Sequence, residues 1–123
     1  MRGNKAKKVI LKKMIKYCDE VAQMLEKHNF SREDFDNNSE FQFAAGMCII
    51  QLGELISRLD DNFIERYPEV PWRQIKNMRN IYAHDYEIVD NDIMWRTITV
   101  KIPELKEQLQ EILNSVSSEE NQV

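Results

Sequence analysis

Apolar residues recur at alternating spacings of three and four along most of this 123-residue chain, and this periodicity constrains its fold more than any other feature. The first such series comprises Leu11, Met14, Cys18, Val21 and Leu25. This spacing places side chains on one face of an α-helix, so each series predicts a helix with one buried face. The pattern predicts long helices at about residues 5–28, 39–59 and 71–84, and a fourth from near Asp90 through Val116.

The composition agrees with a helical protein. The chain has only 3 Gly and 3 Pro, with 42% hydrophobic and 31% charged residues, which is globular but poor in turn formers. At this length one domain is expected. We therefore expect an all-α protein, an antiparallel four-helix bundle with short additional helices, formed by residues 1–116 and followed by a polar, frayed tail at 117–123.

Local signals refine this expectation. A capped helical turn is expected after Ser31, and a short helix at about residues 62–67. Pro103 is expected to kink or divide the fourth helix because it lacks an amide donor. Gly46 and Gly53 lie inside the second helix, where glycine disfavours helix formation, so we expect them to permit close helix packing.

Membrane and disulfide chemistry are not indicated. The longest uncharged apolar run, Phe43 to Ile50, is far shorter than the roughly 20 residues that cross a bilayer, and no secretion signal is recognised. Cys18 and Cys48 are too few and too far apart for a disulfide framework or a zinc site. We expect buried thiols in a cytoplasmic protein with no membrane contact, metal or cofactor.

The charge is unevenly distributed along the chain. The formal net charge is −4, yet seven basic residues precede the first acidic one. These are Arg2, Lys5, Lys7, Lys8, Lys12, Lys13 and Lys16. Two interpretations stay open: a basic arm that steers a polyanion to one side of the molecule, or solvated lysines on an exposed helix face.

The two histidines are the groups best suited to acid–base chemistry near neutral pH. His28 ends the first expected helix, where a cation interacts favourably with the carbonyl end, so we expect a structural role. His84 differs because it lies in a polar and aromatic cluster at the end of the third expected helix.

Helical geometry separates the two sides of this third helix. The stripe expected to face the core comprises Ile75, Met78, Ile81 and Tyr82. Roughly opposite lie Arg73, Asn77, Asn80 and His84. Arg79 lies about 140° from His84, so the two converge only through the long arginine side chain, a distorted helix end or a second subunit. On spacing alone, an ordinary helix end with solvated polar residues fits equally well.

The segment from Arg79 to His84 matches the R-x4-H motif of HEPN-domain ribonucleases, and the fuller pattern resembles the HepT toxin branch of that superfamily. The supporting matches are Leu52-Gly53-Glu54, Val70-Pro71-Trp72, His84-x-Tyr86, Asp92-Ile93-Met94-Trp95 and Pro103-Glu104-Leu105. Their order and spacing cover residues from about 40 to 110. The first helix matches only in its general apolar pattern.

The resemblance implies a homodimer whose two R-x4-H motifs meet at the subunit interface and cut RNA without a metal. His84 would move the 2′-hydroxyl proton or protonate the leaving oxygen, and Arg79 would stabilise charge on the phosphate, giving a cyclic phosphate product. Asn80 would orient the phosphate or His84. Glu54 is a further supporting candidate, which either pairs with Arg79 or faces solvent.

The resemblance also implies a partner, a small nucleotidyltransferase antitoxin of the MntA type. In some members it transfers AMP to the tyrosine of R-x4-H-x-Y, which is Tyr86 here. AMP would add bulk and negative charge beside the phosphate site and so exclude RNA. The leading hypothesis is therefore an RNase toxin of a toxin–antitoxin pair. The alternatives are a non-catalytic nucleotide- or nucleic-acid-binding partner subunit of a nucleotidyltransferase and, third, a structural dimer.

Overall fold

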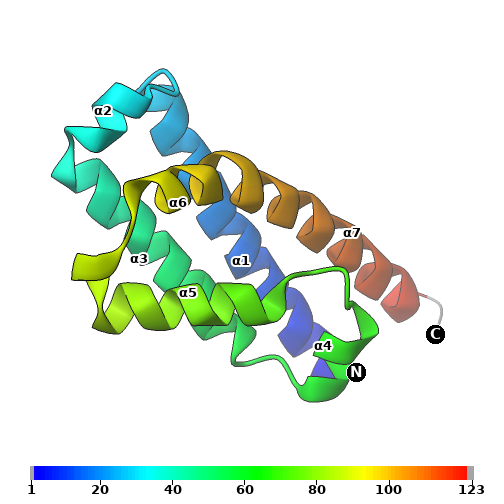
Figure 1. The fold of residues 1–123 in the computed structure, drawn as a ribbon. Helices are drawn as coiled ribbons and strands as arrows, with labels where there is room; N and C mark the ends of the chain where they lie inside the picture. The colour runs from blue at the N-terminus through cyan, green and yellow to red at the C-terminus, as the bar shows by residue number, and fades with distance from the viewer. Residues whose placement is uncertain (1, 122–123) are drawn as a thin grey trace.

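The computed structural model describes residues 2–121, and within this range the chain is all-α, without a strand (Figure 1). The four long helices are α1 (Arg2–Lys27), α3 (Ser39–Ile56), α5 (Trp72–His84) and α7 (Ile102–Asn121). The short helices are α2 (Arg32–Asp36), α4 (Asp61–Arg66) and α6 (Asn91–Arg96), with a 3₁₀ turn η1 (Tyr86–Ile88) and a π-helical turn η2 (Thr97–Lys101). The predicted fold class and its four main helices are confirmed.

The bundle is built around α1, which packs against both α3 and α7. Figure 1 shows α1 running antiparallel to these two neighbours, whereas α5 lies across α3 at a steeper angle. Within residues 2–121 no helix is long and apolar enough to span a membrane. The α5 helix therefore packs mainly against α3. This packing determines the direction of its polar face, which carries Arg73, Asn77, Asn80 and His84.

The periodic apolar residues form the core. In α1 the series from Leu11 to Leu25 is at most 2% exposed. The corresponding buried residues of the second and fourth predicted helices are Phe41, Ala45, Cys48, Leu52, Leu55, Leu59, Ile98, Ile102, Leu105, Leu109, Ile112 and Val116. The expected burial of Cys18 and Cys48 is confirmed, and it raises the pKa of the Cys18 thiol to about 12 and that of Cys48 to about 11.

Side-chain caps explain where four of the helices begin. In each case a short polar side chain accepts a hydrogen bond from a backbone amide in the first turn, which satisfies a donor that has no intrahelical partner. The capping residues are Ser31 for α2, Asn38 for α3, Asp60 for α4 and Asp90 for α6. By contrast, α5 follows Pro71 and has no side-chain cap, and the Trp72 Nε1 donates to the Tyr67 carbonyl at 2.9 Å.

The fourth predicted helix is divided, as Pro103 suggested, but the division takes the form of a π-helical turn. The Ile102 amide donates to the Thr97 carbonyl, five residues back, and the chain then continues as α7. The hydroxyl of Thr97 donates to the Ile93 carbonyl at 2.8 Å, and that of Thr99 to the Trp95 carbonyl at 2.7 Å. The Ile93 carbonyl also accepts from the Thr97 amide, so the threonine hydroxyls add to the backbone hydrogen bonds of this turn.

Two helix ends differ from the expected positions. The α3 helix ends at Ile56, three residues before the predicted boundary, although Leu59 remains buried in the following turn. The α7 helix continues to Asn121, so residues 117–121 are helical where we expected a frayed tail at 117–123; residues 122 and 123 lie outside the described range. The Arg66 guanidinium donates to the Glu119 carboxylate at 2.8 Å and ties this last turn to α4. The single domain at 1–116 stays a prediction.

The crossing of α3 and α5 depends on glycine. A Cβ added at Gly53 would overlap the Arg79 Cβ and lie 2.7 Å from its Cγ, so α5 approaches closer here than any larger residue allows. A Cβ at Gly46 would lie 3.2 Å from the Tyr86 ring and 3.6 Å from Tyr82. The expectation that the two glycines permit close packing is confirmed. Gly53 thereby fixes where the Arg79 side chain leaves its helix.

We expect the Gly53→Ala variant to be destabilised by about 1–3 kcal/mol, because the overlap with Arg79 outweighs the gain of about 1 kcal/mol in helix propensity. Urea unfolding followed by circular dichroism measures the change. The matched control is Gly3→Ala in α1, where an added Cβ meets nothing within 4 Å. Equal stability of the two variants would show that the crossing does not require glycine.

Candidate active site

Arg79 is held at the α3–α5 crossing by two polar neighbours. Its guanidinium forms an ion pair with the Glu54 carboxylate on α3, and its Nη1 donates to the Asn80 Oδ1 at 3.0 Å. The side chains of Arg79 and Glu54 are 30% and 41% exposed, so the pair remains open to solvent and adds little to stability. Of the two possibilities for Glu54, the structure shows the pairing. The pair orients the guanidinium and leaves it accessible.

His84 lies at the C-terminal end of α5, one turn beyond Asn80. It is the last residue of α5, its side chain is exposed, and it forms no hydrogen bond with any of the described residues. It lines a shallow hollow of about 320 Å³ together with Asp85, Tyr86 and Glu87. The prediction that His84 lies off the core is confirmed. An exposed imidazole without a hydrogen-bond partner can accept a proton from a bound substrate or donate one to it.

The expected core stripe of α5 is only partly correct. Tyr82 is buried, while Ile75 and Met78 are half-buried. Ile81 is 40% exposed, so its predicted burial is wrong. The prediction assumed that neighbouring helices bury the whole apolar stripe of α5. In the structure α5 packs mainly against α3, which leaves Ile81 partly exposed. The Tyr82 hydroxyl is buried without a partner among the described residues, and burial raises the pKa of Tyr82 to about 12.

Arg79 and His84 do not form a pair within one copy of the chain. They stand on one continuous helix, which separates them by about 140° around the axis and about 7.5 Å along it. The structure therefore brings together Glu54, Arg79 and Asn80, and leaves His84 apart. The helix end is not distorted in a way that closes this gap, since α5 remains regular to His84. A substrate or a second copy is needed to unite the two groups.

Tyr86 follows directly in η1 and is half-buried. Its ring packs over Gly46 and contacts the rings of Phe43 and Tyr82, with centroid separations of 5.3 and 6.2 Å. This burial raises the pKa of the Tyr86 phenol. The ring is thus fixed by α3 and α5, and it shares the shallow hollow with His84.

Exposed apolar side chains flank this hollow and were not singled out from the sequence. Phe43, Met47 and Ile88 are 59%, 54% and 72% exposed, and we refer to them as the α3–η1 patch. Phe43 contacts the Tyr86 ring, Met47 follows one turn later on α3, and Ile88 ends η1. A signal was present: Phe43 and Met47 fall outside the three-and-four series of their helix. Exposed apolar clusters of this kind mark interaction surfaces.

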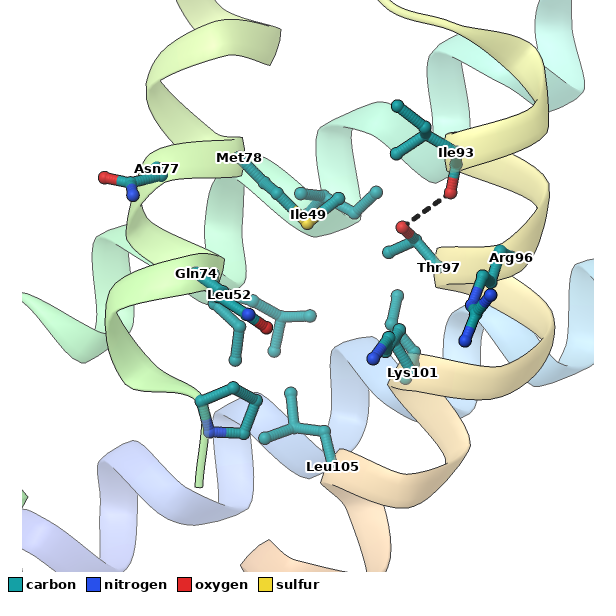
Figure 2. Close-up of a pocket in the computed structure, with 13 residues that line it drawn as sticks. Ile49, Leu52, Gln74, Asn77, Met78, Ile93, Arg96, Thr97, Lys101 and Leu105 are labelled. Atoms are coloured by element: carbon teal, nitrogen blue, oxygen red, sulfur yellow. Dashed lines mark hydrogen bonds between the residues drawn. The ribbon is translucent and has the colours of Figure 1, made fainter. Parts of the chain in front are cut away.

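A second pocket, of about 310 Å³, lies between α5 and the segment formed by α6, η2 and α7 (Figure 2). Its lining is mostly aliphatic, with the side chains of Leu52, Met78 and Leu105 directed into it (Figure 2). The charged lining residues, Arg96 and Lys101, come from the α6–η2 side. None of the residues predicted for catalysis lines this pocket, although Asn77 from the polar side of α5 does.

The basic segment of α1 lies away from His84. Lys7 pairs with the Asp60 carboxylate at 3.4 Å and lies over the Phe63 ring, so part of the segment has a structural role. In Figure 1 the start of α1 and the His84 end of α5 lie on opposite sides of the molecule. The other histidine, His28, stacks on Phe41 with a centroid separation of 4.5 Å, in agreement with a structural role.

Comparison with known proteins identifies the family. The family model described as "Ribonuclease HepT-like" matches residues 14–112, which include every predicted site residue and most of α1. The resemblance therefore extends further toward the N-terminus than the motifs alone indicated. No solved structure gives a significant match to the chain.

Relatives with known names cover nearly the same length. "Putative RNase MJ1216" of Methanocaldococcus jannaschii is 26% identical over 92% of this chain and 92% of its own. "Putative RNase TTE0752" of Caldanaerobacter subterraneus is 32% identical over 84% of this chain and 90% of its own. "Probable ribonuclease HepT" of Thermococcus cleftensis is 31% identical over 78% and 92%, respectively. The chain belongs to the HepT-like ribonuclease family.

Proposed function

We propose that this protein is a metal-independent endoribonuclease, the toxin of a toxin–antitoxin pair, and that Arg79 and His84 are its catalytic residues. The observation that supports this most directly is that α5 presents an oriented arginine, Arg79, and an exposed histidine, His84. Arg79 is oriented by Glu54 at a glycine-dependent crossing, and His84 is exposed at the helix end without a hydrogen bond to any described residue. Family membership and the names of the relatives favour RNA as the substrate.

The proposed site is completed by a second copy of the chain. Because Arg79 and His84 lie about 140° apart on α5, one copy presents them to different directions. The α3–η1 patch adjoins the His84 hollow and exposes apolar surface that a symmetric contact would bury. A two-fold contact on this patch would bring the Arg79 of one copy toward the His84 of the other. It would also exclude water from the reacting groups.

In the proposed reaction, the RNA 2′-oxygen attacks the adjacent phosphorus. The new bond joins the 2′-oxygen to phosphorus, the bond from phosphorus to the 5′-oxygen breaks, and the products are a 2′,3′-cyclic phosphate and a 5′-hydroxyl. His84 removes the 2′-hydroxyl proton or protonates the leaving 5′-oxygen, and another group of the second copy or solvent water supplies the complementary step. Arg79 stabilises the charge that develops on the non-bridging phosphate oxygens.

Asn80 and Glu54 support Arg79 in this scheme. Asn80 accepts a hydrogen bond from the guanidinium and offers an amide group to the same phosphate. Glu54 holds the guanidinium in place before RNA binds, and its partial exposure lets the phosphate share the remaining donors. Glu54 acts through Arg79 alone and is assigned a positioning role, whereas Asn80 also orients the phosphate.

We further propose that a nucleotidyltransferase antitoxin silences the toxin in the cytoplasm by transferring AMP to Tyr86. The phenol oxygen would attack the α-phosphorus of ATP, pyrophosphate would leave, and the phenol proton would pass to a base. Burial raises the pKa of Tyr86, so the phenol needs a base to give up its proton. The modified ring lies in the His84 hollow, so the AMP group would occupy the space that the RNA phosphate needs.

The catalytic assignment predicts that His84→Ala lowers RNA cleavage by about 10²–10⁴-fold, because a positioned acid–base group contributes a factor of this size. Purified protein is incubated with total RNA in the presence of EDTA, and the cyclic phosphate ends are quantified. His28→Gln, which changes the other histidine, is expected to cleave as the unmodified protein does. Equal cleavage by all three proteins would indicate a contaminating nuclease and remove the enzymatic assignment.

The silencing model predicts an intact-mass increase of one AMP group after co-expression with a nucleotidyltransferase encoded beside the toxin. The increase should vanish in Tyr86→Phe and persist in Tyr67→Phe, which alters another half-buried tyrosine. Cleavage activity should fall in proportion to the modified fraction. An unmodified wild-type chain, or an adduct that persists in Tyr86→Phe, would contradict the model.

A further inference from the structure

We propose that a hollow between the end of α3, α4 and α5 binds the phosphate backbone of single-stranded RNA next to the bond that is cut. The inference rests on the proposed ribonuclease function and adds a substrate-binding subsite to it. The hollow has a volume of about 420 Å³, and we refer to it as the α4–α5 hollow. Its polar lining residues are Ser57, Asp61, Arg73, Lys76, Asn77 and Asn80.

The charges of this hollow favour an anion. Arg73 and Lys76 are exposed, and neither forms an ion pair with an acidic side chain in the described part of the chain. The one carboxylate among the lining residues is Asp61, so the hollow has a net positive charge in a protein whose formal net charge is −4. Unpaired arginine and lysine side chains beside serine and asparagine are typical of phosphate contacts in nucleic-acid complexes.

The hollow is joined to the proposed catalytic group through Asn80. The side chain of Asn80 lines the hollow, and its Oδ1 accepts the hydrogen bond from the Arg79 Nη1 at 3.0 Å. A strand that leaves the Arg79 guanidinium therefore meets the hollow directly. Arg73, Asn77, Asn80 and His84 also follow one another at helical spacing on the same stripe of α5.

The distances along α5 indicate which phosphate is bound. In the shared site proposed above, the reacting phosphate lies against Arg79. Lys76 and Arg73 lie about 4.5 and 9 Å from Arg79 along the helix axis and about 60° and 120° around it. They reach a neighbouring phosphate of the same strand. The floor of the hollow is apolar and includes Ile56 and Ile64, which suits the face of an unstacked base from a single strand.

Contacts to a neighbouring phosphate that does not react are the same before and during the reaction, so their loss should raise KM and leave kcat unchanged. Each lost phosphate contact should also lower the salt dependence of binding, by about 0.7 per contact for a single strand. Losing both Arg73 and Lys76 should therefore reduce the slope of log K against log salt by about 1.4.

Binding is measured by fluorescence polarisation of a short labelled single-stranded RNA, in a His84→Ala background that prevents cleavage. The test variant is Arg73→Ala/Lys76→Ala. The matched control, Arg96→Ala/Lys101→Ala, removes one arginine and one lysine from the α6–η2 edge of the apolar pocket, outside the α4–α5 hollow. We expect the test variant to weaken binding on the order of tenfold at low salt, with the reduced slope, and the control to leave both unchanged. Asp61→Asn should tighten binding.

Three results would overturn this subsite: equal weakening by both double variants, unchanged binding in Arg73→Ala/Lys76→Ala, or no RNA binding in the His84→Ala background. The outcome is separable from that of the proposed function. If the protein does not cleave RNA but binds it through Arg73 and Lys76, the proposed subsite stands and the catalytic assignment is wrong. An active protein whose KM is unaffected by the double variant loses the subsite alone.

Discussion

The close approach of α3 and α5 at Gly53 is the constraint on which the polar face of this molecule depends. With no side chain at Gly53, the stem of Arg79 lies against the α3 backbone, one residue from the carboxylate that binds its guanidinium. A larger residue at this position would push α5 outward and move Arg79, Asn80 and His84 together. The partly exposed ion pair adds little stability. The ion pair instead holds the Arg79 guanidinium in place at the surface, beside the α4–α5 hollow.

The same crossing explains why the candidate site is incomplete in one copy. Since α5 packs mainly on α3, its outer flank and its C-terminal end stay uncovered, and His84 and Ile81 are left in solvent. Acid–base and electrostatic catalysis are most effective where water is excluded. A second copy seated on the exposed patch formed by Phe43, Met47 and Ile88 would provide that exclusion. The exposure of the apolar patch and that of the candidate residue His84 would then have a common explanation.

Much of the fold could be predicted because helical periodicity and capping are local properties. The series in α1 lies on one buried face, Ser31 caps α2, and the two internal glycines of α3 mark close contacts. The pairing of Glu54 with Arg79 stayed open, since spacing within one helix cannot show what a neighbouring helix places beside it. The exposure of Ile81 was missed for the same reason. The helical turn at residues 117–121 contacts Arg66, which is remote in sequence.

The family resemblance supplied the catalytic motif, while the structure supplied its surroundings. Motif spacing alone placed Arg79 and His84 on opposite flanks of a helix, and the regular geometry of α5 agrees with that. The α3–η1 patch was not foreseen, because it depends on a contact between segments distant in sequence. Pro103 indicated a kink or a division, but not that it would take the form of a π-helical turn. The R-x4-H motif can therefore be interpreted only together with the residues that surround Arg79 and His84 in the structure.

Mixing two inactive variants tests the shared site most directly. In a heterodimer of Arg79→Ala and His84→Ala chains, a site formed from the arginine of one copy and the histidine of the other leaves one composite site intact. Random pairing should then restore about a quarter of the wild-type RNA cleavage, because half of the dimers are mixed and each has one complete site. A mixture that stays as inactive as its components, although the chains exchange, would contradict a catalytic site shared between two copies.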